Sequence, residues 1–299
     1  MSTTTITRRG RARKGIRRGA ILIGVLWLLI FLAFVAVVLR VHLSGIADSV
    51  RSTEGKAAAR IVAEAALAEA AALAIVETRA EGATAARLFG QTETVNGTGR
   101  FALINESVRV DLNSGLEPLV TGALLASGAS VNEAATLTRA IMDPRESRTG
   151  GGPPDPEMPG TPATISFNDL SEIALLPGIP AEVAIGMEEL ATVSSGLEGI
   201  RIEDADRALL EAIPNFPASA LAAIDAYRAG RIDRTQLVAE LGLLEYHADG
   251  NAPSWRARLD VELSTGHRES YEALVAIAPD DTRPYRILGW QRLDIVDGQ

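Results

Sequence analysis

The feature that most constrains this chain is an uncharged apolar run from Ala20 to Leu39. A helix needs about 20 apolar residues to cross the hydrocarbon layer of a bilayer. A secretory signal peptide has a shorter apolar core, of roughly 7–15 residues, followed by a cleavage site of small residues. Here the run is longer, and Arg40-Val41-His42-Leu43 follows it. We therefore expect residues 20–39 to form a transmembrane helix that anchors the chain.

The charges on the two sides of the run are unequal. Residues 1–19 carry seven Lys and Arg residues and no acid, whereas the remaining 22 basic residues stand against all 38 acids, a net charge of −16. Basic residues stay on the cytoplasmic side of a membrane. We expect a single-pass protein whose N-terminus is cytoplasmic and whose bulk lies on the other side. The acidic bulk argues against nucleic acid as a partner.

The junction Arg17-Arg18-Gly19-Ala20 resembles the leader of a type IV prepilin. The resemblance implies that a membrane peptidase cuts after Gly19 and methylates Ala20, so that residues 1–19 are a leader. Gly15 is a less suitable cleavage site, because Arg17 and Arg18 would then begin the helix. Most pilins carry a glutamate at the fifth mature position, where this chain has Gly24. A carboxylate is costly in a membrane unless it is paired.

Beyond the membrane, residues 40–90 are expected to continue the helix. Apolar residues recur there at spacings of four and three, which is typical of a packed helix face. The simplest interpretation is a helix docked on a sheet; the same face could also join partner subunits. This predicted helix-packing seam consists of Ile61, Ala65, Ala68, Ala72 and Ile75.

Strands are expected on both sides of a helical region. In residues 91–112, Asn96-Gly97 predicts a turn, and Phe101–Asn105 with Val108–Leu112 suggests a short hairpin. In residues 251–299, alternation of apolar and polar residues predicts three strands. These strands are Trp255–Leu263, Tyr271–Ile277 and Tyr285–Leu293.

Residues 113–250 are mostly rich in Ala and Leu and predict a helical insert. A Gly- and Pro-rich stretch from Met142 to Pro162 predicts a loop within it. Two segments repeat one pattern, Leu175–Pro180 and Ala212–Pro217, and each suggests the tight turn of a helix-hairpin-helix unit. The expected fold class is α+β: a pilin-like long N-terminal helix packed on an antiparallel sheet, with a large helical insert between strands.

These features together resemble the type II secretion minor pseudopilins of the GspK family (general secretion pathway protein K). The resemblance covers most of residues 10–293. It also draws on Val110–Asn113 before the insert, Asn168–Glu172 before Leu176-Pro177-Gly178, and Tyr285–Trp290 at the end.

The resemblance implies a protein of the bacterial inner membrane with its bulk in the periplasm. It would sit at the tip of a short pseudopilus, initiating or capping its assembly and aiding export of folded proteins. Its implied partners are other minor pseudopilins, the major pseudopilin, the prepilin peptidase and the inner-membrane secretion platform.

Family members can bind calcium, which needs six to eight oxygen ligands. The residues after Ile141 supply only four weak candidates, diluted by Gly and Pro, so that a solvated loop is the simpler interpretation and no cofactor is assigned. These candidates are Asp143, Glu146, Asp155 and Glu157.

Three other functions remain as alternatives. The first is a membrane-anchored hydrolase that lacks the common motifs. No common catalytic motif is present in the sequence, and the absence of cysteine excludes a thiol nucleophile. The chain is therefore not expected to be an enzyme. A membrane-anchored helix-hairpin-helix DNA receptor is the second, disfavoured because residues 165–229 contain eleven acids and three arginines. The third is a minor pilin of another type IV-like filament.

Overall fold

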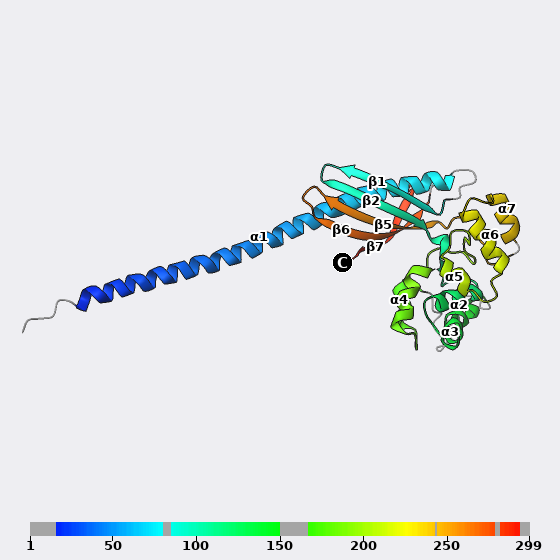
Figure 1. Ribbon diagram of the computed structural model, residues 1–299, viewed down its shortest axis with the longest axis horizontal. Helices are drawn as coiled ribbons and strands as arrows, with labels where there is room; N and C mark the ends of the chain where they lie inside the picture. The colour runs from blue at the N-terminus through cyan, green and yellow to red at the C-terminus, as the bar shows by residue number, and fades with distance from the viewer. Residues whose placement is uncertain (1–15, 80–84, 150–166, 243, 279–281, 294–299) are drawn as a thin grey trace, which may run out of the picture. The chain divides into compact units, whose positions relative to one another are not determined.

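The computed structural model describes residues 16–79, 85–149, 167–242, 244–278 and 282–293 (Figure 1). The chain divides into two compact units, residues 1–58 and 59–299. Helix α1, Ile16–Arg79, contributes to both of them. The first unit contains its N-terminal part, and the second contains its last turns and everything after them.

The second unit contains a five-stranded antiparallel sheet in the order β1-β2-β5-β6-β7. Its strands are β1 Arg87–Thr94, β2 Gly97–Asn105, β5 Ser254–Leu263, β6 Arg268–Ile277 and β7 Tyr285–Leu293. In β5 and β6, buried residues alternate with partly exposed ones, as expected for a sheet with one covered face. Strands distant in sequence are thus neighbours, since β2 pairs directly with β5.

The last turns of α1 cover the buried face of this sheet. Gly99 in β2 allows close approach, because a Cβ atom there would lie 2.9 Å from the Cβ atom of Ala66 and 3.3 Å from Val62. The ring of Phe101 lies beneath Gly90 of β1 in the same way. Close approach of the helix to β2 therefore depends on glycine and alanine at the contact between them.

Between β2 and β5 the chain forms the helical insert, which has its own apolar core. Short elements β3, Val110–Asp111, and β4, Ala191–Thr192, pair in parallel within it. The helices are η1 Glu106–Val108, α2 Glu117–Ala126, α3 Val131–Thr149, η2 Leu170–Leu175, α4 Ala181–Leu190, α5 Arg207–Ala212, α6 Ala218–Arg228 and α7 Arg234–Leu241.

The expected α+β class with an antiparallel sheet and a helical insert is confirmed, as are the three C-terminal strands. The predicted hairpin of Phe101–Asn105 with Val108–Leu112 is wrong. Strand β2 pairs instead with β1 and β5, and Val110 pairs with Ala191 of the insert. The helix expected to reach residue 90 ends at Arg79, and strand β1 was missed because its residues Arg87–Thr94 include few apolar side chains.

Candidate functional site

The apolar run near the N-terminus lies within α1. Residues Leu22–Arg40 have a mean hydropathy of 3.1, and none of this stretch is buried, so that the helix has the length and composition to cross a membrane. Gly24 has no atom within 4 Å of the point that a Cβ would occupy. Gly19 and Ala20 belong to the helical backbone, but their side chains and the leader residues 1–15 lie outside the described residues. Processing after Gly19 therefore stays a prediction.

The last turns of α1 have two contrasting faces. One face packs on the sheet through residues that are almost completely buried, namely Ala59, Val62, Ala63, Ala66, Leu67, Ala70, Ala71 and Ala74. Further contacts hold the helix in place: the Glu77 carboxylate accepts the Ala85 amide at 2.8 Å, the Glu69 carboxylate accepts the Thr92 hydroxyl, and the Arg60 guanidinium lies 5.4 Å from the centre of the Trp290 ring.

The opposite face of these turns is apolar and open. Ile61 is 59% exposed and Val76 is 66% exposed. Ala68 and Ala72 are exposed, and Ala65 and Ile75 are half-buried. At 3.6 residues per turn, the predicted seam from Ile61 to Ile75 lies opposite the buried set.

The seam is therefore not the face that docks on the chain's own sheet. Spacing alone could not separate the two faces, because alanines recur along both. Whether the seam packs against a partner helix is not tested by the fold, and that interpretation stays a prediction. We call Ile61, Ala65, Ala68, Ala72, Ile75 and Val76 the outward face of α1.

A buried carboxylate joins the start of the insert to a later loop. Asp111 is 1% exposed, and its Oδ1 atom accepts the amides of Asn113 and Ser114 at 2.7 and 3.1 Å. Its Oδ2 atom accepts the Ser195 amide and hydroxyl and the Gly196 amide at 2.9–3.0 Å. Five donors satisfy one carboxylate, so that this side chain fixes two segments of the insert together.

A second buried group connects the insert to the sheet. Glu106 is completely buried, and Arg256 of β5 donates to it at 3.0 Å and to Glu272 of β6 at 2.6 Å. Burial lowers the pKa of Arg256, but the two carboxylates outweigh that effect and raise it above its ordinary value. Burial lowers the pKa of the adjacent Arg109, which lies 4.0 Å from Glu106. No local pattern in the sequence indicates that these charges are buried.

A third polar cluster surrounds Arg201, which is 2% exposed and lies 2.6 Å from Asp204 and 3.4 Å from Glu203. Burial raises the pKa of Asp204, although Arg201 opposes the shift. Asp206 caps α5, as its position before the helix suggests.

The histidines in the described residues have acidic neighbours. His247 Nε2 lies 3.1 Å from Asp249, and His267 Nε2 lies 3.1 Å from Glu269. In each pair one residue separates the partners, so that they lie on the same side of an extended segment. The side chain of His42 is outside the described residues.

The two repeated turns have the same geometry. Ile179 N–H donates to Leu176 C=O and Phe216 N–H donates to Ile213 C=O, with Gly178 and Asn215 at positive φ of 83° and 59°. Proline at the second position and a residue with positive φ at the third define a type II turn.

The three arginines of residues 165–229 each contact other groups of the chain. Arg201 and Arg207 pair with carboxylates, and Arg228 donates to the carbonyls of Glu203 and Ala205. These three arginines are thus already engaged with groups of the chain, and the excess of acids around them disfavours contact with phosphate.

Of the four candidate metal ligands, only Asp143 has a side chain among the described residues. Asp143 is exposed, and the side chains of Glu146, Asp155 and Glu157 lie outside the described residues. Within the described part of the chain there is no group of three or more His, Asp or Glu side chains that could hold a metal ion. Calcium binding therefore remains untested.

The long helix, the antiparallel sheet and the inserted helices together define a pseudopilin-like α+β fold. In the comparison with solved structures, the chain is similar to a chain of the GspK-GspI-GspJ complex from the type 2 secretion system of enterotoxigenic Escherichia coli. The TM-score is 0.56 at 14% identity, and the match covers 82% of this chain and 99% of that chain. No protein-family model matches the sequence. No curated protein matches it either.

Proposed function

We propose that this chain is a minor pseudopilin of a type II secretion system. The observation that supports this role is the outward face of α1, an apolar surface on a long helix whose opposite face is already buried on the sheet. Apolar surface on an ordered helix is a suitable contact for another helix. The similar chain comes from a complex of three proteins, GspK, GspI and GspJ.

In this proposal residues 1–19 are removed as a leader, residues 20–39 span the bacterial inner membrane once, and the rest lies in the periplasm. The remainder of α1, which ends at Arg79, supplies the periplasmic helix. Strands β1, β2, β5, β6 and β7 supply the sheet, and the elements between β2 and β5 supply the insert. The protein would act as a non-catalytic subunit that binds two other minor pseudopilins, and then the major pseudopilin, the prepilin peptidase and the secretion platform.

The proposal places the subunit at the tip of the pseudopilus. Gly24 carries no carboxylate that could pair with the amino terminus of a subunit above it. The insert also makes the head bulky, which is difficult to repeat at close spacing along a filament. Both features suit a capping subunit that is present in few copies.

Co-purification from membranes tests the role of the outward face. The full-length chain is co-expressed with two other minor pseudopilins, extracted in detergent and purified through a tag on this chain. A stoichiometric complex is expected. The double variant Ala65→Glu, Ala72→Glu should weaken it, because two carboxylates would enter an apolar interface.

The matched control is Ala181→Glu, Ala218→Glu, which adds the same charge at exposed first-turn positions of α4 and α6. This control should retain both partners. If wild-type protein ran alone in the presence of both partners, or formed long homopolymers, the proposed role would be wrong.

A further inference from the structure

The β1–β2 hairpin ends in an exposed asparagine that is followed by a glycine. Val95 and Asn96 form the turn, and both are exposed. Gly97 cannot be replaced without disturbance, because a Cβ atom there would lie 2.3 Å from the carbonyl oxygen of Glu262 and 2.7 Å from the Cα atom of Leu263. Packing against β5 therefore fixes glycine as the residue that follows Asn96.

We propose that Asn96 is a site of spontaneous deamidation. The backbone nitrogen of Gly97 attacks the side-chain carbonyl carbon of Asn96, and a C–N bond forms in a cyclic tetrahedral intermediate. The bond from that carbon to the side-chain nitrogen breaks, ammonia leaves with the proton that the Gly97 nitrogen gives up, and a five-membered succinimide remains. Water then adds to one of the two ring carbonyls and gives aspartate or isoaspartate. Glycine favours the attack because it has no Cβ atom beside its nitrogen, and the reaction needs no oxidant, metal or enzyme.

The surroundings of Asn96 leave its side chain accessible. Its backbone amide donates to the Thr94 hydroxyl at 3.2 Å, and its carbonyl accepts the Ser264 amide at 2.9 Å. Within the described residues, no hydrogen bond holds its side-chain amide. Gly97 pairs with Thr94 in the last rung of the ladder. Opening of this rung frees the nucleophile, and ends of ladders open most readily.

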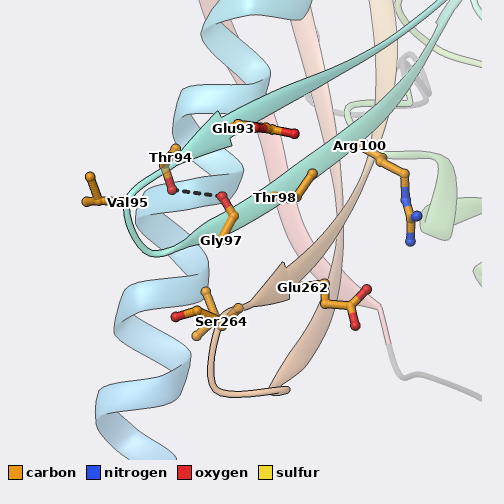
Figure 2. Close-up of a pocket in the computed structure, with 9 residues that line it drawn as sticks. Glu93, Thr94, Val95, Gly97, Thr98, Arg100, Glu262 and Ser264 are labelled. Carbon is orange, nitrogen blue, oxygen red and sulfur yellow. Dashed lines mark hydrogen bonds between the residues drawn. The ribbon is translucent and has the colours of Figure 1, made fainter.

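Both products change the ends of the two hairpins. The turn borders a hollow of about 400 Å³ whose lining includes Glu93, Glu262 and Arg100 (Figure 2). Either product adds one negative charge to this turn. Isoaspartate also moves the carbonyl that accepts the Ser264 amide. The hydrogen bond between the β1–β2 turn and the β5–β6 turn is then lost.

The experiment incubates detergent-purified full-length protein at neutral and mildly alkaline pH and follows tryptic peptides by tandem mass spectrometry. Asn96 is the only asparagine in the peptide Leu88–Arg100. Asn132 and Asn168 are internal controls, because both are exposed but precede Glu133 and Asp169. Conversion of Asn96 is expected to be on the order of tenfold faster than theirs, since an acidic residue hinders the attacking nitrogen and glycine does not.

Two further measurements keep the proposal falsifiable. Asn96→Gln should abolish the mass change in the peptide, and the converted fraction should exchange the Ser264 amide hydrogen faster. If Asn96 converts no faster than Asn132 in the folded protein but rapidly in urea, the hairpin protects it and the proposal is wrong. Conversion without faster exchange of the Ser264 amide hydrogen would refute the predicted loss of its hydrogen bond to residue 96.

Discussion

Strands β5 and β6 and the helical insert are held in place in different ways. Along β5 and β6 every second side chain is buried, from Trp255 to Leu263 and from Glu269 to Ile277. The insert has an apolar core too, but its connections to its own loops and to the sheet run through buried polar groups such as Asp111, Glu106 and Arg201. Apolar alternation is visible in a sequence, whereas a buried ion pair depends on partners far apart in the chain.

This difference leads to an expectation about unfolding. A buried polar group stabilises only while all its partners are in place, and losing one leaves others unsatisfied. Truncation of one apolar side chain leaves no polar group unsatisfied, so that its neighbours keep most of their contribution to stability. Loss of a buried polar group in the insert should therefore destabilise the insert more than the sheet, whereas changes in the apolar core should destabilise both together.

The largest effect is expected for Asp111→Ala. It leaves four backbone amides of residues 113, 114, 195 and 196 without their acceptor. We expect a loss of about 3–5 kcal/mol in the free energy of unfolding. Hydrogen exchange should rise in residues 192–197 more than in β5 and β6.

The matched control is Glu198→Ala, which removes an exposed carboxylate from the same loop. It should change stability by about 0.5 kcal/mol or less. If hydrogen exchange rose equally in residues 192–197 and in β5, Asp111 would not be stabilising the insert separately from the sheet.

A smaller and more uniform effect is expected for Leu103→Ala in β2. Leu103 is completely buried, and truncation of a buried leucine costs about 2–5 kcal/mol. Because the buried polar groups between the insert and the sheet keep their partners, the insert and the sheet should lose stability together. Fluorescence of Trp255 and Trp290 should report one midpoint, and hydrogen exchange in α2 and α5 should agree with it. Two separated transitions would show that these polar groups do not couple the regions.

The same difference explains what could be predicted from the sequence. The strands Trp255–Leu263 and Tyr271–Ile277 were predictable because local alternation of apolar and polar residues is typical of a half-buried sheet. The position of Val110 was not, because Asp111 and its five donors draw it to Ala191 in the insert, 81 residues away. The outward face of α1 was predicted as a packing seam, but alanines on both sides of the helix concealed which face covers the sheet.

A more local difference concerns the two type II turns of the insert. Gly178→Ala should destabilise by about 1–2 kcal/mol, because its φ of 83° is unfavourable for a residue with a Cβ atom. Asn215→Gly should change stability by only a few tenths of a kcal/mol, since asparagine already tolerates this conformation. Chemical denaturation of both variants measures these two changes in the free energy of unfolding. Similar costs would mean that the turns do not share one backbone geometry.

The smallest effect is expected at the sheet surface, where charges are solvated. Arg268 donates to Glu262 at 2.8 Å, and this hydrogen bond holds the pKa of that carboxyl below its ordinary value. A lowered pKa in the folded state stabilises above the ordinary pKa of the acid, and that contribution is lost as the pH falls through the folded value. Arg268→Gln should therefore raise the pKa of Glu262 in an NMR titration and weaken the dependence of stability on pH in the acid range. Arg286→Gln, an exposed change on β7, should leave the titration of Glu262 unaltered. An unchanged pKa of Glu262 in the Arg268→Gln protein would show that water competes successfully for this pair, as it does for many exposed ion pairs.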